Sequence, residues 1–282
     1  MSAFVDYLER VRPAIDEALS GYLAVAESPL GEWMRYAVLD GGKRVRPALV
    51  LAAAEACGGS IDQALPAACA AEFVHAYSLV HDDLPAMDDD EERRGRPTVH
   101  VEFGEAAAVL AGDALLTLAF EALSRGGAGA GVAPEVIVGQ VADLAHAAGP
   151  AGMVLGQSED LAARGREVDA GTLSAVEMRK TGYLLAACAR MGGRSAGASG
   201  DVLATLHDYG LSLGLAYQLA DDLLDVGKDE SDEAMFPTLI GEERTRELAG
   251  EARDKARGVA LSLGPGGEVL ASLADFAVER EG

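Results

Sequence analysis

Apolar residues recur at the spacing of an α-helix through almost the whole of this chain, and this pattern limits the folds that it can adopt. Alanine and leucine dominate those positions, whereas alternating runs of β-branched residues, which indicate strands, are nearly absent. Breaks rich in glycine and proline divide the pattern into about ten segments. The sequence therefore predicts an all-α fold of about ten helices.

Capping patterns predict where two of these helices begin. Ser60-Ile61-Asp62-Gln63 has the form of a capping box and predicts a helix from about Asp62 to Asp83. Ser174 and Glu177 repeat the pattern and predict a helix through Arg190. The glycine run from Gly126 to Gly131 is expected to be a flexible loop. Further breaks are expected at Asp40-Gly41-Gly42, Gly58-Gly59, Arg94-Gly95-Arg96-Pro97, Gly192-Gly193 and Gly264-Pro265-Gly266.

Length and composition limit the class of protein. With 282 residues, 49% of them hydrophobic, and no marked shift in composition, the chain is expected to form a single domain over residues 1–282. It has no run of about 18 uncharged apolar residues and no leader-like start, so we expect a cytoplasmic protein without stable membrane insertion. The net charge of −23 argues against a nucleic acid or an anionic membrane as partner. The three widely spaced cysteines are expected to be reduced core residues.

Two acidic clusters, Asp82 to Asp88 and Asp221 to Asp225, each end an apolar segment that is predicted to be helical. The aspartates of the second cluster are three and four residues apart, so they share a helix face and repel one another. In the first cluster, Pro85 offers the bend that would bring its aspartates together. Because Mg²⁺ is commonly held by one or two carboxylates plus substrate phosphates, the clusters predict a site that holds a diphosphate through metal. Taken alone, the first cluster also fits a solvated, acidic helix end.

Basic residues are scarce in this chain, and several lie near the acidic clusters. Gly41 to Pro47 places three cations in four positions after a glycine turn, and Arg93 to Thr98 follows the first cluster. Arginine suits phosphate oxygens, so these segments predict two anionic groups, one bound through metal and one directly by side chains. Either segment alone also fits a surface turn. Lys180-Thr181 and Gln218 lie within apolar helices, where polar side chains need partners.

Seven segments form an ordered set over nearly the whole chain: Gly41 to Pro47, Tyr77 to Asp90, Arg93 to Thr98 with His100, Ala111 to Leu115, Gly156-Gln157, Lys180-Thr181-Gly182 and Tyr217 to Asp225. This set resembles the trans-isoprenyl diphosphate synthases, the polyprenyl synthetase family, and bacterial farnesyl diphosphate synthases above all. The resemblance implies mostly antiparallel helices around a deep apolar cavity, with the two aspartate clusters facing each other at its mouth. It also implies a homodimer.

The resemblance implies a reaction as well. Isopentenyl diphosphate would condense with dimethylallyl or geranyl diphosphate to give farnesyl diphosphate, by Mg²⁺-assisted ionisation, addition and loss of a proton. Three Mg²⁺ ions would be bound with the substrate, with Mn²⁺ as an alternative ion. By the same resemblance, the metal ligands would be Asp82, Asp88 and Asp221, with Asp83, Asp222 and Asp225 as their helpers. The allylic diphosphate would be held by Arg93, Lys180 and Lys228, and isopentenyl diphosphate by Lys43, Arg46, His75 and Arg94. The catalytic residues would be Lys180, Thr181 and Gln218, the last two along the path of the developing cation.

Two positions bear on specificity. Tyr77 precedes Asp82 by five residues, about 7.5 Å along a helix, where its ring would floor the cavity and limit the product to C15. An ordinary core tyrosine is the alternative. The segment Val226 to Pro237 is shorter than the resemblance implies: Gly227-Lys228 matches one expected lysine, but Glu233 stands where a second is expected. We therefore expect a weaker hold on the allylic diphosphate, or a remodelled lid.

Other functions stay open at this point. The product could be geranyl or geranylgeranyl diphosphate instead of farnesyl diphosphate. A non-catalytic prenyl-binding subunit would have little reason to keep both aspartate clusters. A class I terpene cyclase would not need the isopentenyl diphosphate site at Lys43, Arg46 and Arg94.

Overall fold

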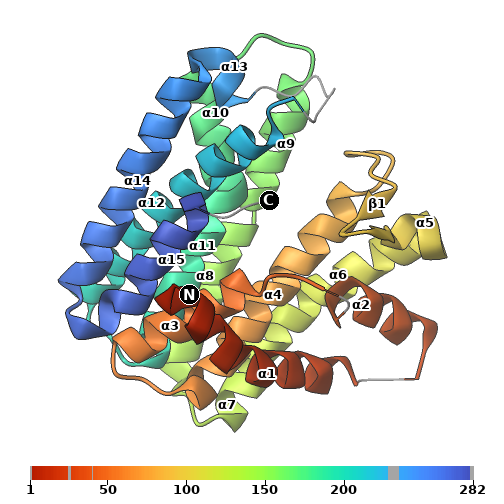
Figure 1. Ribbon diagram of the computed structural model, residues 1–282. Helices are drawn as coiled ribbons and strands as arrows, with labels where there is room; N and C mark the ends of the chain where they lie inside the picture. Colours follow the sequence, from red (N-terminus) through yellow and green to blue (C-terminus); the bar gives the residue numbers. More distant parts are fainter. Residues whose placement is uncertain (1, 25–26, 40, 228–234, 280–282) are drawn as a thin grey trace.

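The computed structural model describes residues 2–24, 27–39, 41–227 and 235–279, and these residues are largely helical (Figure 1). This confirms the predicted all-α fold class. Several of the ten expected segments are divided into shorter helices. The α-helices are α1 (Ala3–Leu23), α2 (Pro29–Leu39), α3 (Val45–Ala56), α4 (Ile61–Asp82), α5 (Val99–Phe103), α6 (Glu105–Glu121), α7 (Gly127–Gly129), α8 (Pro134–Ala148), α9 (Met153–Ala163), α10 (Ala170–Glu177), α11 (Tyr183–Ser195), α12 (Gly200–Asp225), α13 (Phe236–Ile240), α14 (Glu242–Ser262) and α15 (Glu268–Glu279).

Helix α4 lies in the core along most of its length. Ala67, Ala70, Ala71, Phe73 and Val74 point in different directions around it, and all are buried. A helix that is apolar on every side must be surrounded by other helices, and α4 packs against α3, α6 and α11. Helix α11 in turn packs against α3, α8 and α12, and α12 lies beside α14 (Figure 1). The end of α4 therefore has a fixed position relative to α11 and α12.

The predicted N-cap at Ser60, one half of the capping box, is confirmed at the start of α4. The Ser60 hydroxyl accepts a hydrogen bond from the Gln63 backbone N–H at 3.4 Å, and the helix ends at Asp82, one residue before the predicted end. The prediction that Ser174 opens a helix is wrong. Helix α10 already begins at Ala170, because the Asp169 carboxylate caps it by accepting from the Thr172 N–H at 2.7 Å.

A π-helical turn, η2 (Met178–Gly182), separates α10 from α11, where the sequence predicted one continuous helix. The turn lies against α12 at Gly214, where the α12 backbone has no room for a side chain. A Cβ atom on Gly214 would be 2.5 Å from the Gly182 Cα. Single π-turns change the direction of the side chains that they carry and are frequent at functional sites. This one carries Lys180 and Thr181.

The glycine pairs expected to break helices partly do the opposite. Gly192 lies inside α11, because a Cβ atom there would be 2.1 Å from the Val50 carbonyl oxygen of α3. The segment Gly126 to Gly131, expected to be a loop, continues α6 through the π-turn η1 (Ala122–Gly126) and α7 before the chain turns. Both predictions were wrong for one reason: glycine here permits close contact between helices and does not end them.

A small β-hairpin follows the first acidic cluster. Its strands, β1 (Glu92–Arg93) and β2 (Arg96–Pro97), are antiparallel and are joined by Arg94 and Gly95. Both joining residues have positive φ, 57° and 76°, as a two-residue hairpin turn of this kind requires. The sequence placed a break here and did not predict the strands. The remaining short helix is the 3₁₀ turn η3 (Pro265–Gly267), at the expected break before α15.

One continuous helical stretch, Glu105–Gly129, is long and apolar enough to cross a membrane by length and composition. Half of its most apolar part is buried against the rest of the protein, and core helices of folded domains also meet this criterion. The stretch contains Asp113 and Glu121, so it does not contradict the expected absence of an uncharged apolar run.

Candidate active site

The first acidic cluster folds back on itself directly after α4. The backbone N–H of Asp88 donates to the carbonyl oxygen of Asp82 at 2.9 Å, so the two residues are adjacent although six apart in sequence. Burial raises the pKa of Asp82 to about 7, and the negative charges of Asp88 and Asp83 act in the same direction against the opposing effect of Lys180. The predicted bend around Pro85 is present, and it creates a crowded group of carboxylates.

Asp83 points away from this group. Its carboxylate is nearly buried and accepts from Arg93 Nε at 2.7 Å, and the Arg93 guanidinium also contacts Asp90 at 3.1 Å. Burial raises the pKa of Asp83, whereas the positive charge of Arg93 lowers it. These contacts attach the hairpin to the end of α4. Arg93, predicted to hold a diphosphate, is here engaged by two carboxylates.

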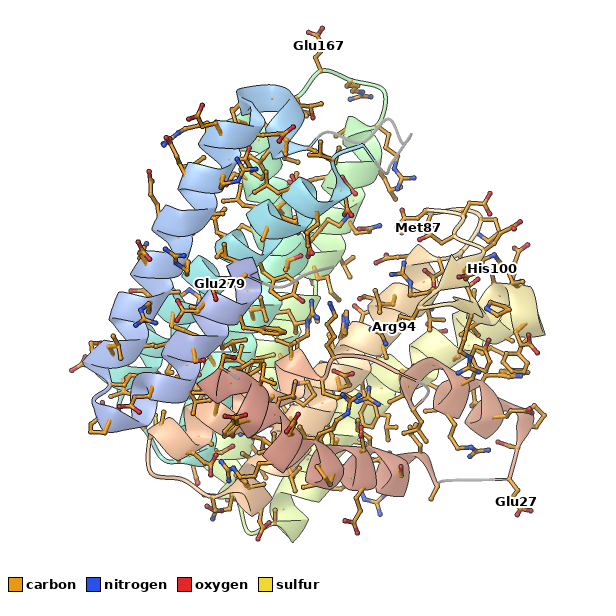
Figure 2. The ribbon with its side chains drawn as sticks, viewed as in Figure 1. Glu27, Met87, Arg94, His100, Glu167 and Glu279 are labelled. Atoms are coloured by element: carbon orange, nitrogen blue, oxygen red, sulfur yellow. The ribbon has the colours of Figure 1, made fainter. Side chains whose placement is uncertain are left out.

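Asp88 also forms a salt bridge with an arginine of this chain. Arg164, which follows α9, contacts the Asp88 carboxylate and donates from Nη1 to the Met87 carbonyl oxygen at 2.6 Å. Figure 2 labels Met87 in the turn beyond α4. The sequence analysis did not select Arg164, because a single arginine after a helix carries no motif.

The second cluster lies on the last turns of α12. Asp221 and Asp225 line a cavity, whereas Asp222 points into the protein and is only 6% exposed. Asp222 accepts from the Phe236 backbone N–H at 2.8 Å and from Gln218 Nε2 at 2.9 Å. Burial raises its pKa, and those two hydrogen bonds oppose the shift. Asp222 therefore anchors α13, and Gln218, predicted to line the path of a cation, holds that carboxylate.

The cavity beside Asp221 and Asp225 has a volume of about 580 Å³ and is rich in basic side chains. Besides these two aspartates, four predicted site residues line it: Lys43, Arg46, His75 and Arg94. They come from the turn before α3, from α4 and from the hairpin, where Figure 2 labels Arg94. The structure thus brings the two predicted basic segments together.

Burial and mutual repulsion affect the basic side chains of this cavity. Burial lowers the pKa of His75 well below its ordinary value, and the neighbouring guanidinium groups of Arg46 and Arg94 act in the same direction, so the imidazole is neutral. Burial also lowers the pKa of Arg94. The Nε of Arg46 is buried and has no hydrogen-bond partner among the described residues. A cluster of basic donors that includes one buried, unpartnered nitrogen suits an anion.

Arg44, counted among the cations of this segment, has a structural role. Its guanidinium is almost fully buried and donates to Glu72 at 2.6 Å, Asp16 at 2.9 Å and the Val38 carbonyl oxygen at 2.8 Å. Arg12 of α1 supports the same turn by donating to the Gly42 carbonyl oxygen at 2.8 Å, and it lines the cavity. The sequence did not indicate Arg12, because it lies 30 residues from the segment that it contacts.

A second cavity, of about 490 Å³, adjoins the first at Arg46 and His75. It is largely apolar, and Asp82 lies at its lining. The predicted residues Tyr77, Lys180 and Thr181 line it together with Met87, Met153, Leu161 and Leu184. The Tyr77 hydroxyl is buried and has no hydrogen-bond partner among the described residues.

Lys180 Nζ donates to Asp160 of α9 at 2.6 Å. Burial alone would lower the pKa of Lys180, but the negative charges of Asp160 and Glu177 outweigh it and the pKa is raised. Lys180 is therefore a charged group beside Asp82. Lys228 and Glu233 lie outside the described residues.

Among the residues that the structure describes, no three Asp, Glu, His or Cys side chains already form a metal site. The reason is that Asp83 and Asp88 contact arginines, and Asp222 points inward. The oxygen donors nevertheless fit a hard divalent cation, because Asp82 and Asp88 lie side by side. Burial, and to a lesser extent the neighbouring carboxylates, raise the pKa of Asp82, and a dication would favour its charged form.

The polyprenyl synthetase family model matches residues 27–234. This chain belongs to the polyprenyl synthetase family. It is 41% identical to the farnesyl diphosphate synthase of Escherichia coli, over 98% of this chain and 99% of the relative. It is 39% identical to a dimethylallyltranstransferase of Fischerella ambigua, over 98% of this chain and 83% of the relative. A geranylgeranyl pyrophosphate synthase of Arabidopsis thaliana is 43% identical over 90% of this chain and 75% of its own length.

Solved structures agree with the family. The crystal structure of an FPP/GFPP synthase from Zymomonas mobilis has a TM-score of 0.90 and 39% identity, and 98% of each chain is covered. A putative farnesyl-diphosphate synthase from Marinomonas has a TM-score of 0.87 and 34% identity, covering 99% of this chain and all of the other. The predicted family and fold are confirmed.

Proposed function

We propose that this protein is a short-chain trans-prenyltransferase that condenses isopentenyl diphosphate with dimethylallyl or geranyl diphosphate to give farnesyl diphosphate. One observation carries the proposal: a basic cavity and an apolar cavity adjoin at Arg46 and His75, and each acidic cluster contributes to one of them. Two anionic head groups and one apolar chain need this combination. The relatives from Escherichia coli, Fischerella ambigua and Zymomonas mobilis described above, all of them prenyltransferases by name, support the proposal.

Isopentenyl diphosphate is assigned to the basic cavity. Lys43, Arg46 and Arg94 would bind its phosphate oxygens directly, and the unsatisfied Nε of Arg46 supplies a donor already directed away from solvent. Neutral His75 would donate a hydrogen bond without adding a charge. Arg44 and Arg12 hold the turn that carries Lys43.

The allylic diphosphate is assigned to the mouth of the apolar cavity. Asp82 and Asp88 at this mouth, with Asp221 and its helper Asp225 on the adjoining basic cavity, would hold magnesium between the two clusters, with manganese as an alternative ion. Three ions, the number implied by the family, would neutralise the leaving diphosphate. Lys180 would add a positive charge to the same group, and its contact with Asp160 keeps it protonated.

The apolar cavity protects the reaction from water. Met153, Leu161 and Leu184 line the space in which an allylic carbocation would form, so water would not quench it before the isopentenyl double bond adds. Thr181 lines the same cavity and would face that cation. The proton released after addition would pass to the departing diphosphate.

Tyr77 would set the length of the product. Its ring lines the apolar cavity and lies one to two turns of α4 below Asp82. A chain growing from a diphosphate near Asp82 would meet this ring. Relatives named as geranylgeranyl pyrophosphate synthases make a longer product the main alternative.

We also propose a homodimer and a cytoplasmic location, with residues 1–282 forming one domain. Val101 of α5 and Val109 and Leu110 of α6 are 42–52% exposed on neighbouring helices, and a second copy would cover them. Sedimentation equilibrium of the purified protein measures this: a mass of two chains supports the homodimer, and a mass of one chain at all concentrations refutes it.

The function is tested by incubating the protein with Mg²⁺, labelled isopentenyl diphosphate and each of dimethylallyl, geranyl and farnesyl diphosphate, and then sizing the products. C15 chains from the first two primers support the proposal. C10 or C20 products correct the chain length only. Cyclic hydrocarbon from farnesyl diphosphate alone would identify a terpene cyclase, and no elongation of any primer would indicate a non-catalytic subunit.

A further inference from the structure

One cation at the mouth of the apolar cavity is not explained by the roles above. Arg164 follows the last residue of α9 with an extended backbone, φ −53° and ψ 131°, and its side chain reaches the turn beyond α4. There it contacts the Asp88 carboxylate and the Met87 carbonyl oxygen, 76 and 77 residues away in sequence. The contact therefore joins two elements on opposite sides of this mouth.

Arg164 shares a helix face with residues that already line the site. Gln157, Asp160 and Arg164 are spaced three and four residues apart, which places them on one side of α9 and its end. Gln157 lines the apolar cavity, and Asp160 holds Lys180. The guanidinium of Arg164 is thus on the side of α9 that faces the proposed diphosphate position.

The partner of Arg164 is one of the proposed metal ligands. Asp88 lies next to Asp82, and its carboxylate contacts the Arg164 guanidinium. If Oδ1 of Asp88, the oxygen that contacts Arg164, coordinates a divalent cation, the positive charge of the ion weakens its interaction with the guanidinium. The released donors need another acceptor, and the phosphate oxygens of the allylic substrate would be the nearest strong one.

We propose that Arg164 is a diphosphate-binding residue of this site: its guanidinium neutralises Asp88 before metal binds and turns to the allylic diphosphate when Asp88 takes a divalent cation. The inference rests on the proposed function, since it assumes that an allylic diphosphate lies at this mouth. It would also compensate for the lysine that the family resemblance leads us to expect in segment Val226 to Pro237, where Glu233 stands instead. Arg164 supplies a cation from α9 instead.

Isothermal titration calorimetry tests this without turnover. Wild type, R164A, R164K and R166A are titrated first with Mg²⁺ alone and then with inorganic diphosphate at saturating Mg²⁺. Arg166 is an exposed arginine two residues away, so R166A removes the same charge from the same segment. Circular dichroism verifies folding, and R164Q replaces R164A if R164A is unfolded.

The two titrations should move in opposite directions in R164A. Diphosphate should bind about 10–100-fold more weakly, as expected for one lost charge-assisted hydrogen bond, whereas Mg²⁺ alone should bind as well or up to about 10-fold more tightly because its competitor is gone. R164K should recover part of the diphosphate affinity, and R166A should match wild type. An unchanged diphosphate affinity in R164A, or weaker binding of Mg²⁺ alone, overturns the inference.

The outcome is separable from that of the proposed function. If wild type elongates primers but R164A binds diphosphate normally, the role of Arg164 is wrong and the function stands. If wild type elongates no primer but R164A loses diphosphate affinity, Arg164 binds diphosphate in a protein with another activity.

Discussion

Replacing Glu72 with alanine would leave a buried arginine without its main partner. The side chains of Arg44 and Glu72 are 3% and 6% exposed, and removing one member of such a pair costs about 3–5 kcal/mol of folding free energy. Arg44 would keep its contacts with Asp16 and the Val38 carbonyl oxygen, so we expect the lower end of that range, about 3 kcal/mol. For a chain of this size, the midpoint of thermal unfolding should fall by roughly 6–10 °C.

Urea unfolding and thermal melts measure this loss. The matched control is E121A, which removes a carboxylate from the exposed pair of Glu121 and Arg125, whose side chains are 48% and 82% exposed. Pairs exposed to this degree contribute at most about 1 kcal/mol, so E121A should be nearly neutral. E72Q, which can still accept a hydrogen bond from Arg44, should lie between E72A and wild type.

The same substitution should affect one substrate more than the other. Arg44 holds the turn that carries Lys43 and Arg46, so E72A should raise the KM for isopentenyl diphosphate several-fold and change the KM for the allylic substrate less. If E72A costs no more stability than E121A, or raises both KM values equally, the assigned role of the Arg44–Glu72 pair is wrong.

Three further predictions follow from single contacts. The pKa of His75 is depressed in the folded protein, so only the unfolded chain gains a proton there as the pH falls below about 6.5. Between pH 7.5 and 5.5, urea unfolding should therefore show a larger loss of stability in wild type than in H75Q. Equal losses would contradict this. D222A should lower the melting temperature, because the backbone N–H of Phe236 loses its hydrogen-bond acceptor. D221A should lower kcat strongly with little change in melting temperature, because Asp221 lines the basic cavity. The reverse pattern would refute these two assignments. Y77A should yield products longer than C15 by chromatography, and an unchanged product would make Tyr77 an ordinary core residue.

Much of the fold was predictable because its signals are local. Helical periodicity gave the fold class, and the capping box at Ser60 placed the start of α4. Glycine misled the prediction at Gly126 and Gly192, since its role there depends on a neighbouring helix that the sequence does not show. The π-turn at Lys180 also depends on a neighbour, because α12 approaches Gly182 directly.

The site was predictable in its members but less so in their orientation. The motifs identified Asp82, Asp83 and Asp222, yet they did not reveal that Asp83 binds Arg93 or that Asp222 binds the Phe236 backbone. Adjacent aspartates on a helix end point in different directions, and only the packing decides which one faces the cavity. Arg12, Arg164 and the partner of Arg44 were missed because each acts across a long separation in sequence.

The most direct measurement of the central claim is a crystal structure of the protein with Mn²⁺ and inorganic diphosphate, in which anomalous scattering locates the ions. We expect anomalous peaks coordinated by Asp82, Asp88 and Asp221, with the diphosphate between them and the Arg164 and Lys180 side chains. Ions bound elsewhere, or a diphosphate held away from both acidic clusters, would contradict it.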